Sequence, residues 1–449
     1  MSEVAPQSGP PMRPLSAWLL LVFLFLAYIL SFVDRMILSL LVEPIKADMG
    51  LSDTQVSLLQ GLAFALFYTL VGLPIGRVVD MSSRVRLVAA GVSVWSLMTA
   101  LCGLAQSYWQ LFLARVGVGV GEATLSPAAY SMIADSFEKK RLGLAMGVYG
   151  LGAATGAGLA FMIGGAVIAA VARGGPVTVP FIGELAAWQT AFLIVGLPGL
   201  ALAAVFMMLP EPPRRGAGAA DAVKLSAVLA FIKDRRGFLG FHFLAMGLVN
   251  LGIFASASWI AVLLIRNHGV AIETAGYLAG AALMIGGLFG AVGGGFFSDR
   301  IAKDGALKAR LGFCAATAVV GACFAVAFPL AQGAALTVIL FGAAFLFGGV
   351  PVGVAAAALQ QGVPNRMRGM VSALYLFTIN LIGLGLGPTA VALVTDFVFG
   401  DEQMVRYSLA IVVPAAFFLA AAAFVASSRY ADRGSGAPPS AVGDHGLGD

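Results

Sequence analysis

Charged side chains are scarce in this 449-residue sequence, where Asp, Glu, Lys and Arg together make up 11% of the residues. Soluble domains carry about 25% charged residues, whereas 60% of this chain is hydrophobic and its mean hydropathy is +0.94. Long apolar runs recur from Leu15 to about Ser427. The composition therefore excludes a disordered chain, a nucleic-acid-binding protein and a soluble enzyme with a single anchor.

Cysteine and histidine are also rare, with three of each. The cysteines have no CxxC spacing and lie in apolar stretches, which disfavours disulfides and zinc ligation: Cys102, Cys314 and Cys323. The histidines are far apart, and neither an HExxH nor a GxSxG motif is present: His242, His268 and His445. We therefore expect no metal, no cofactor and no enzymatic activity.

The apolar runs have the length that crosses a bilayer. About twenty helical residues span a hydrocarbon core of roughly 30 Å, so the chain accommodates about twelve crossings. The predicted helices are 15–42, 53–76, 86–106, 108–134, 142–171, 186–209, 238–265, 272–297, 308–331, 333–361, 368–395 and 404–428.

One long polar interruption divides these runs into two sets of six. We expect a cytoplasmic N-terminal tail at 1–14, an N-terminal six-helix bundle at 15–209, a cytoplasmic linker at 210–237, a C-terminal bundle at 238–428 and a cytoplasmic tail at 429–449. Within the linker, 222–232 can form a short helix on the membrane surface; a solvated connector is the alternative. The first apolar run is too long for a signal peptide, so no cleavage is expected.

Lys and Arg residues are distributed unevenly between the two sides of the predicted membrane. With the N-terminus inside, 21 of the 27 fall in loops and tails on that side. The positive-inside rule therefore predicts that both termini are cytoplasmic. Four lie on the opposite side, namely Lys46, Arg173, Arg266 and Arg406. The short tails and the Ala/Gly-rich composition favour a bacterial inner membrane.

The two sets of helices contain corresponding segments. GRVVD at 76–80 closes the second helix and GFFSDR at 295–300 closes the eighth, while Arg141 with Tyr149 corresponds to Arg368 with Tyr375. Matching segments in two halves are typical of transporters with a site between the halves. The predicted fold is therefore an all-α membrane protein with twelve transmembrane helices in two pseudo-symmetric six-helix bundles.

Four charged residues lie inside the predicted membrane, in the first and fourth helices. A charge at the bilayer centre costs about 2.5–3.5 kcal/mol on insertion scales, so it is usually paired and functional. At about 1.5 Å rise per residue, Asp34 and Arg115 lie at nearly the same depth in the membrane, and Glu122 lies roughly 10 Å deeper. The four residues are Asp34, Arg35, Arg115 and Glu122.

This arrangement predicts a substrate-binding and proton-coupling site. The carboxylate that Arg115 contacts should be ionised, and the other should be free to take a proton. A static ion pair that fixes helix packing is the alternative. Arg35 faces partly sideways from Asp34, because adjacent helical residues point about 100° apart; it either binds an anionic head group or pairs with a neighbour.

A gate is expected at the cytoplasmic ends of the second and eighth helices. Carboxylates there can cap the N-termini of the approaching eleventh and fifth helices and hold that face shut; ordinary loop charges are the alternative. The expected gate residues are Gly76, Asp80, Arg84, Asp299 and Arg300. Asn250 and Asn380 are possible polar residues of the cavity.

The helix count and the GRVVDMSSRVR segment at 76–86, together with GFFSDR, resemble the major facilitator superfamily. Met81 departs from that pattern, which usually has a basic residue there, so we expect the first gate to be weaker than is typical. FVDR at 32–35 and RVGVGVGEA at 115–123 resemble the spinster-type branch, including its bacterial members.

The resemblance implies transport of sphingolipids or lysophospholipids, with Asp34, Arg35, Arg115 and Glu122 as the substrate-binding and proton-coupling set. We therefore predict a proton-coupled transporter of a lipid-like molecule that acts by alternating access. It would act as a monomer in the lipid bilayer, with protons as coupling ions and no nucleic-acid partner. The alternatives are a multidrug/proton antiporter, a facilitative uniporter and a lipid-binding receptor; a channel fits two inequivalent halves less well.

Overall fold

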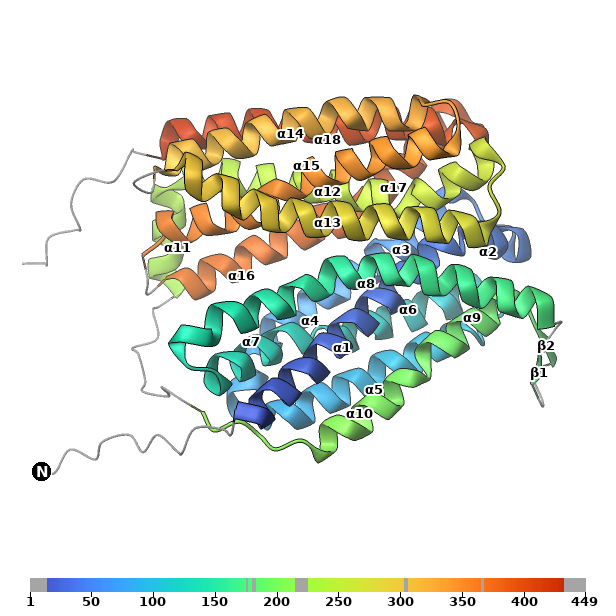
Figure 1. Cartoon of the computed structure of the whole chain (residues 1–449), viewed down its shortest axis with the longest axis horizontal. Helices are drawn as coiled ribbons and strands as arrows, with labels where there is room; N and C mark the ends of the chain where they lie inside the picture. Colours follow the sequence, from blue (N-terminus) through green and yellow to red (C-terminus); the bar gives the residue numbers. More distant parts are fainter. Residues whose placement is uncertain are drawn as a thin grey trace, which may run out of the picture.

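The computed structural model describes residues 14–174, 177–179, 183–214, 225–302, 306–364 and 367–431. Most of the two predicted tails and the middle of the predicted linker lie outside these ranges. The described chain forms two groups of roughly parallel helices that lie side by side (Figure 1).

The N-terminal half contains ten helical pieces, several of them consecutive parts of one crossing. They are α1 (Pro14–Leu40), α2 (Val42–Met49), α3 (Asp53–Gln60), α4 (Leu62–Met81), α5 (Arg84–Cys102), α6 (Tyr108–Glu122), α7 (Leu125–Ser136), α8 (Lys139–Gly174), α9 (Ala187–Gly196) and α10 (Pro198–Met208).

The C-terminal half follows a short linker helix, α11 (Leu225–Asp234), which falls within the linker as predicted. Its long helices are α12 (Arg236–His268), α13 (Ile272–Ile301), α14 (Leu307–Leu330) and α15 (Ala334–Gly362). The eleventh crossing consists of α16 (Arg368–Ile379), η2 (Asn380–Gly385), α17 (Leu386–Leu393) and η3 (Val394–Phe399), and the last consists of η4 (Glu402–Met404) and α18 (Val405–Tyr430).

Eleven segments of the described chain are long and apolar enough to span a membrane. The remaining crossing is formed by α6 and α7, which a turn at Ala123 and Thr124 separates. At about 1.5 Å per residue neither piece alone crosses a hydrocarbon core. Together they occupy the place of the predicted helix 108–134, so the twelve-helix prediction is confirmed.

A two-stranded antiparallel hairpin was not predicted. It consists of β1 (Val177–Val179) and β2 (Gly183–Leu185) and connects α8 to α9. The hairpin lies at the right of Figure 1, and the start of α1 lies at the left. We call these the hairpin end and the termini end of the molecule.

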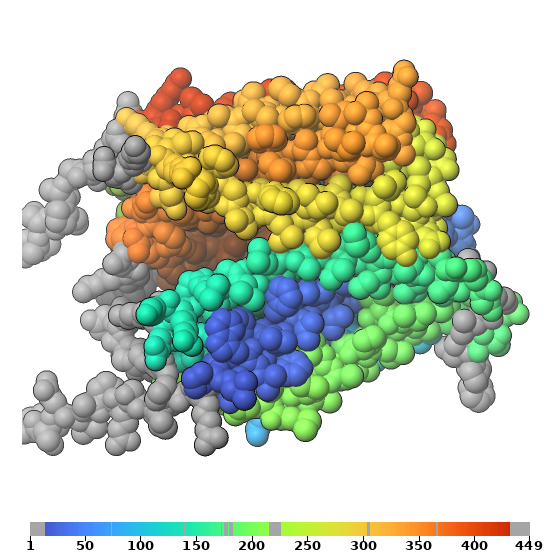
Figure 2. Space-filling view, viewed as in Figure 1, coloured from blue at the N-terminus to red at the C-terminus, as the bar shows by residue number. Residues whose placement is uncertain are grey.

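The apolar core shows that the two halves are joined mainly at the hairpin end. One cluster combines side chains of both halves, including Ile37, Phe161, Trp259 and Leu283. Toward the termini end the core divides into an N-terminal cluster, which includes only Leu384 from the other half, and a separate C-terminal cluster. On the face drawn in Figure 2, a recess between the halves accordingly widens toward the termini end.

A close backbone crossing marks the place where the core divides. The second crossing breaks between α3 and α4 at Gly61, and a Cβ built there would lie 2.7 Å from the carbonyl oxygens of Leu384 and Gly385. Only glycine allows this approach. The partner segment, η2, is a π-helix, a distortion that is common at functional sites.

Candidate functional site

An ion pair between α1 and α6 is the centre of the charged site. Arg35 Nη2 donates to Glu122 Oε2 at 2.6 Å, and Ser31 Oγ donates to the same oxygen at 2.6 Å. All three residues are buried, with Glu122 only 2% exposed. Glu122 Oε1 and Arg35 Nε have no hydrogen-bond partner. The ion pair therefore leaves one acceptor atom and one donor atom available for a further hydrogen bond.

Aromatic rings surround the Arg35 guanidinium. Its central carbon lies 4.5 Å from the ring centroid of Phe64, 4.8 Å from that of Phe32 and 5.4 Å from that of Tyr68. Ring faces attract a desolvated cation. These contacts hold the guanidinium beside Glu122. Sequence reasoning did not identify Ser31, Phe64 or Tyr68, because their types are ordinary in a membrane helix.

Arg115 does not contact a carboxylate, contrary to the predicted geometry. Its guanidinium donates to the main-chain carbonyls of Leu59 at 3.3 Å, Asp34 at 3.0 Å and Arg35 at 3.5 Å. The side chain is completely buried. Main-chain carbonyls satisfy the guanidinium because Leu59 lies next to the helix break at Gly61, where carbonyls can accept additional donors.

Asp34 points to a different part of the same half. Its neighbours include Trp95 and Thr99 of α5, and its Oδ1 has no hydrogen-bond partner. The indole nitrogen of Trp95 and the hydroxyl of Thr99 lie close enough to interact with this carboxyl group, although neither forms a hydrogen bond of ordinary geometry with the described residues. Asp34 forms no ion pair among the described residues, so the two buried carboxyl groups have very different surroundings.

A cavity of 350 Å³ lies between the halves, on the termini side of the Gly61 crossing. We call it the interhalf cavity. Its N-terminal wall includes Tyr68, Gly76, Ala123 and Tyr130, and its C-terminal wall includes Ala373, Leu376, Phe377 and Asn380. Of the predicted polar residues, Asn380 lines this cavity, whereas Asn250 Nδ2 donates to Met246 O of its own helix at 2.9 Å.

Among the described residues, no hydrogen bond or ion pair of the predicted gate residues connects the two halves at the termini end. Asp299 pairs with Arg310 of its own half at 2.9 Å, and Arg300 lies over the ring of Phe296. Asp80 is exposed at the surface. The contacts that the structure shows for Asp299 and Arg300 thus leave the two halves unconnected there, because the cavity separates them.

Arg84 has a structural role within the N-terminal half. It is completely buried, forms an ion pair with Asp135, and binds Glu211 through a 2.9 Å contact from Nε to Oε1. Glu211 also accepts from Ser83 Oγ and from the backbone N–H of Val85. Burial alone would raise the pKa of Glu211, but these hydrogen bonds outweigh burial and hold its pKa below the usual value.

An ion-pair network connects the halves at the hairpin end instead. Arg266 of α12 reaches Asp53 of α3 at 2.7 Å and Glu43 of α2 at 2.7 Å. Lys46 of α2 pairs with Asp53 and reaches Glu402 of the other half at 2.7 Å. We call these five residues the hairpin-end network. The sequence carried a signal for it, because Lys46 and Arg266 are two of the four cations on the side poor in positive charge.

A second polar contact across the halves lies close to this network. Both the backbone N–H and the hydroxyl of Thr54 donate to Asp396 Oδ2 at 2.7 Å. Asp53 is completely buried and the Arg266 side chain is only 3% exposed. The hairpin end is therefore closed by an ion-pair network whose central charges, Asp53 and Arg266, are buried.

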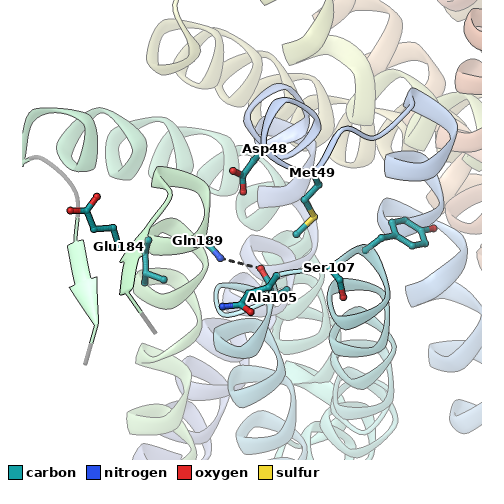
Figure 3. A pocket seen from close by; sticks show the side chains of 9 residues that line it. Asp48, Met49, Ala105, Ser107, Glu184 and Gln189 are labelled. Carbon is teal, nitrogen blue, oxygen red and sulfur yellow. Dashed lines mark hydrogen bonds between the residues drawn. The ribbon is translucent and has the colours of Figure 1, made fainter. Parts of the chain in front are cut away.

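A second cavity lies away from the charged pair. It measures 580 Å³ and lies at the hairpin end within the N-terminal half, between α2, β2 and the loop before α6 (Figure 3). Gln189 Nε2 donates to Ala105 O there at 3.0 Å. This recess is not between the halves, so it is not part of a path through the molecule.

Two helical halves that join at one end and have a cavity between them, with a buried ion pair next to its wall, are the architecture of a membrane transporter with its site between the halves. The particular family follows from comparison. The family model of the Major Facilitator Superfamily matches residues 24–388, and this chain belongs to that family. Its members are integral membrane transporters and not enzymes.

Relatives with different named functions match most of the chain. An MFS-type efflux pump of Mycolicibacterium smegmatis is 29% identical over 93% of this chain and 94% of its own. A sphingosine-1-phosphate transporter of Danio rerio is 24% identical over 89% and 83%. A probable L-galactonate transporter of Escherichia coli is 25% identical over 87% and 85%.

A solved structure confirms the predicted resemblance to the spinster-type branch. The inward-facing, unoccupied form of a bacterial homologue of the human lysosomal transporter Spinster aligns with a TM-score of 0.79 at 25% identity. The alignment covers 93% of this chain and 98% of that protein.

Proposed function

We propose that this protein is a proton-coupled secondary transporter of an amphiphilic, lipid-like substrate of the sphingolipid or lysophospholipid type. One observation carries the proposal. The buried Arg35–Glu122 pair lies directly behind the N-terminal wall of the interhalf cavity, since Tyr68 and Ala123 line the cavity and adjoin the pair.

The opposite wall suits an alkyl chain. Ala373, Leu376 and Phe377 of α16 present apolar side chains to the cavity. A polar head group could then exchange contacts with Arg35, while the tail lies against α16.

The two buried carboxyl groups, Asp34 and Glu122, have different surroundings and are assigned different roles in transport. Glu122 is neutralised by Arg35, whereas Asp34 has no cationic partner among the described residues. An unpaired ionised carboxylate is expensive to bury, so we assign Asp34 as the carrier of the coupled proton and Glu122 as the group that exchanges Arg35 with substrate. The roles of Arg35 and Arg115 in binding are part of the same proposal.

We further propose that both termini face the cytoplasm of a bacterial inner membrane, as the distribution of Lys and Arg favours. The termini end would then be cytoplasmic, and this conformation would be inward-facing. Transport would use the proton gradient without a bound cofactor, and one chain would form the complete pathway.

The test is uptake of a fluorescent lysophospholipid into proteoliposomes with and without a pH gradient. We expect the gradient to accelerate uptake and Glu122→Gln and Asp34→Asn to abolish the acceleration, while Glu138→Gln, an exposed carboxylate at the termini end, behaves as wild type. Uptake that ignores the gradient would identify a uniporter. Binding without movement across sealed vesicles would identify a receptor.

A multidrug/proton antiporter is the second candidate, favoured by the aromatic rings of Tyr68, Tyr130 and Phe377 in the cavity and by the efflux-pump relative. Lipophilic cations stack on such rings. Competition of lysophospholipid uptake by tetraphenylphosphonium, and its export from loaded vesicles, would support this candidate. Competition by a sugar acid alone would exclude both.

A further inference from the structure

A cavity outside the transport path lies at the termini end of the C-terminal half. It measures 500 Å³ and lies where α11 ends, α12 begins and α18 ends. Its lining combines charge of both signs with aromatic rings: Asp234, Arg235, Arg236, Gly237, Phe241 and Tyr430. None of these residues belongs to the interhalf cavity.

The aromatic wall of this cavity is held in place by packing. The rings of Phe241 and Tyr430 are stacked, with centroids 6.0 Å apart and an interplanar angle of 19°. A Cβ at Gly237 would lie 2.6 Å from the Tyr430 ring, so the ring lies directly against the α12 backbone. The end of α18 is thereby fixed to the start of α12.

The cavity lies beside the start of the membrane-spanning segment Arg236–His268, so in a bilayer it would be near the lipid head groups. Val228 of α11 is completely buried in the C-terminal cluster, against which Phe231 and Ile232 also pack, whereas Leu229 is exposed. The linker helix thus rests on the bundle at the point where the transmembrane helix α12 starts. Tyrosine and arginine at such a position are typical of the membrane interface.

The charges match a zwitterionic head group better than a simple anion. Two guanidinium groups can bind a phosphodiester, while one carboxylate beside stacked rings can accept an ammonium group. We propose that this cavity binds the head group of a phospholipid that carries both a phosphodiester and a primary ammonium, as in phosphatidylethanolamine. Arg235 and Arg236 bind the phosphate, and Asp234 with Tyr430 binds the ammonium.

The test uses native mass spectrometry of the delipidated full chain with phosphatidylethanolamine, or with phosphatidylglycerol, which lacks the ammonium. We expect wild type to retain the ethanolamine lipid preferentially. The Arg235→Gln/Arg236→Gln variant should bind it about tenfold more weakly, as loss of charge-assisted hydrogen bonds predicts. Asp234→Asn should remove the preference but not the binding. Arg141→Gln, which removes an exposed cation at the same end, is the matched control.

A photoreactive phosphatidylethanolamine tests the location on the wild-type chain, independently of whether the variants fold. Its adducts should map to peptides that contain 234–241 and 430. Equal retention of both lipids by wild type, unchanged binding in the double variant, or adducts elsewhere would overturn the proposal. If inorganic phosphate or glycerophosphoethanolamine reduced this photolabelling as much as the unlabelled lipid does, the cavity would bind a soluble ligand instead.

Discussion

At the residue scale, the Arg35–Glu122 pair makes a prediction about stability that does not depend on transport. Glu122 is 2% exposed, so removing its partner leaves a carboxylate in a desolvated site. Breaking a buried pair from one side costs about 3–5 kcal/mol. Arg35→Ala should therefore lower the thermal midpoint in detergent, measured by scanning fluorimetry.

A double variant provides the control for Arg35→Ala. Adding Glu122→Gln to Arg35→Ala removes the stranded charge, so the double variant should recover most of the lost stability while remaining inactive in gradient-driven uptake. If Arg35→Ala alone is as stable as wild type, the pair contributes nothing to the fold in this conformation.

Glu211 provides a prediction with a defined pH dependence. Its pKa is lower in the folded state than in the unfolded chain, so its contacts stabilise the protein fully above the unfolded pKa, which is about 4.3. This stabilisation is lost as the pH falls through the folded pKa. Because the side chain is 35% exposed, roughly 1 kcal/mol is expected.

Glu211→Gln should therefore be less stable than wild type near neutral pH, and the difference should shrink as the pH falls below about 4.3 and vanish below the folded pKa. Hydrogen exchange of the backbone N–H groups of Arg84 and Val85, which face Glu211, measures the effect locally. A difference that stays constant across this range would contradict the assignment.

At the element scale, the helix break at Gly61 determines how the halves cross. The crossing requires the absence of a side chain, since a Cβ would lie 2.7 Å from two carbonyl oxygens of η2. Gly61→Ala should separate α4 from η2 and lower stability by about 1–3 kcal/mol. Gly147→Ala, where nothing lies within 4 Å, should be neutral or slightly stabilising.

Scanning fluorimetry of the two variants distinguishes a crossing role from general helix propensity. Alanine is favoured over glycine by about 1 kcal/mol inside a helix, which applies to Gly147 within α8, whereas Gly61 lies at the break between α3 and α4. Equal behaviour of Gly61→Ala and Gly147→Ala would therefore show that the crossing tolerates a methyl group.

Helix positions were predictable because hydrophobic length alone defines a membrane crossing. The predicted span 272–297, for example, corresponds to α13 (Ile272–Ile301). The breaks at Gly61 and Ala123 and the π-helix η2 were not predictable, because they arise from contacts between helices. The hairpin was missed because three-residue strands leave no clear periodicity.

The four charged site residues were identified correctly as buried, but their pairing was not. Adjacent helical residues point about 100° apart, and depth alone does not determine which of Asp34 and Arg35 faces α6. The structure places Arg35 on that side, next to Glu122. The pairing thus required the rotation of α1, which the sequence does not specify.

At the scale of the whole molecule, the conformation explains why the gate was predicted at one end while the ion pairs lie at the other. A sequence contains the contacts of every state, whereas one structure contains those of a single state. Here the halves share a core and the hairpin-end network at one end, and a cavity separates them at the other. Alternation requires that network to break.

Arg266→Gln should therefore shift the protein toward a state that is open at the hairpin end. The guanidinium of Arg266 reaches Asp53 and Glu43 of the other half, whereas Arg406 of the same half donates to Leu330 within its own half. Arg406→Gln is thus a matched control. Each 1.4 kcal/mol lost changes the ratio of the two states about tenfold.

Double electron–electron resonance measures the ratio of the two conformational states through the distance between two spin labels. The labels are placed at Gln106 and Gln332, which are exposed residues in opposite halves near the hairpin end. Cys323, the exposed cysteine, is first replaced, whereas Cys102 and Cys314 are buried. Wild type and Arg406→Gln should show mainly the short distance, and Arg266→Gln should add a longer one. Identical distributions in all three proteins would mean that the apolar core, and not the charges, holds the hairpin end closed.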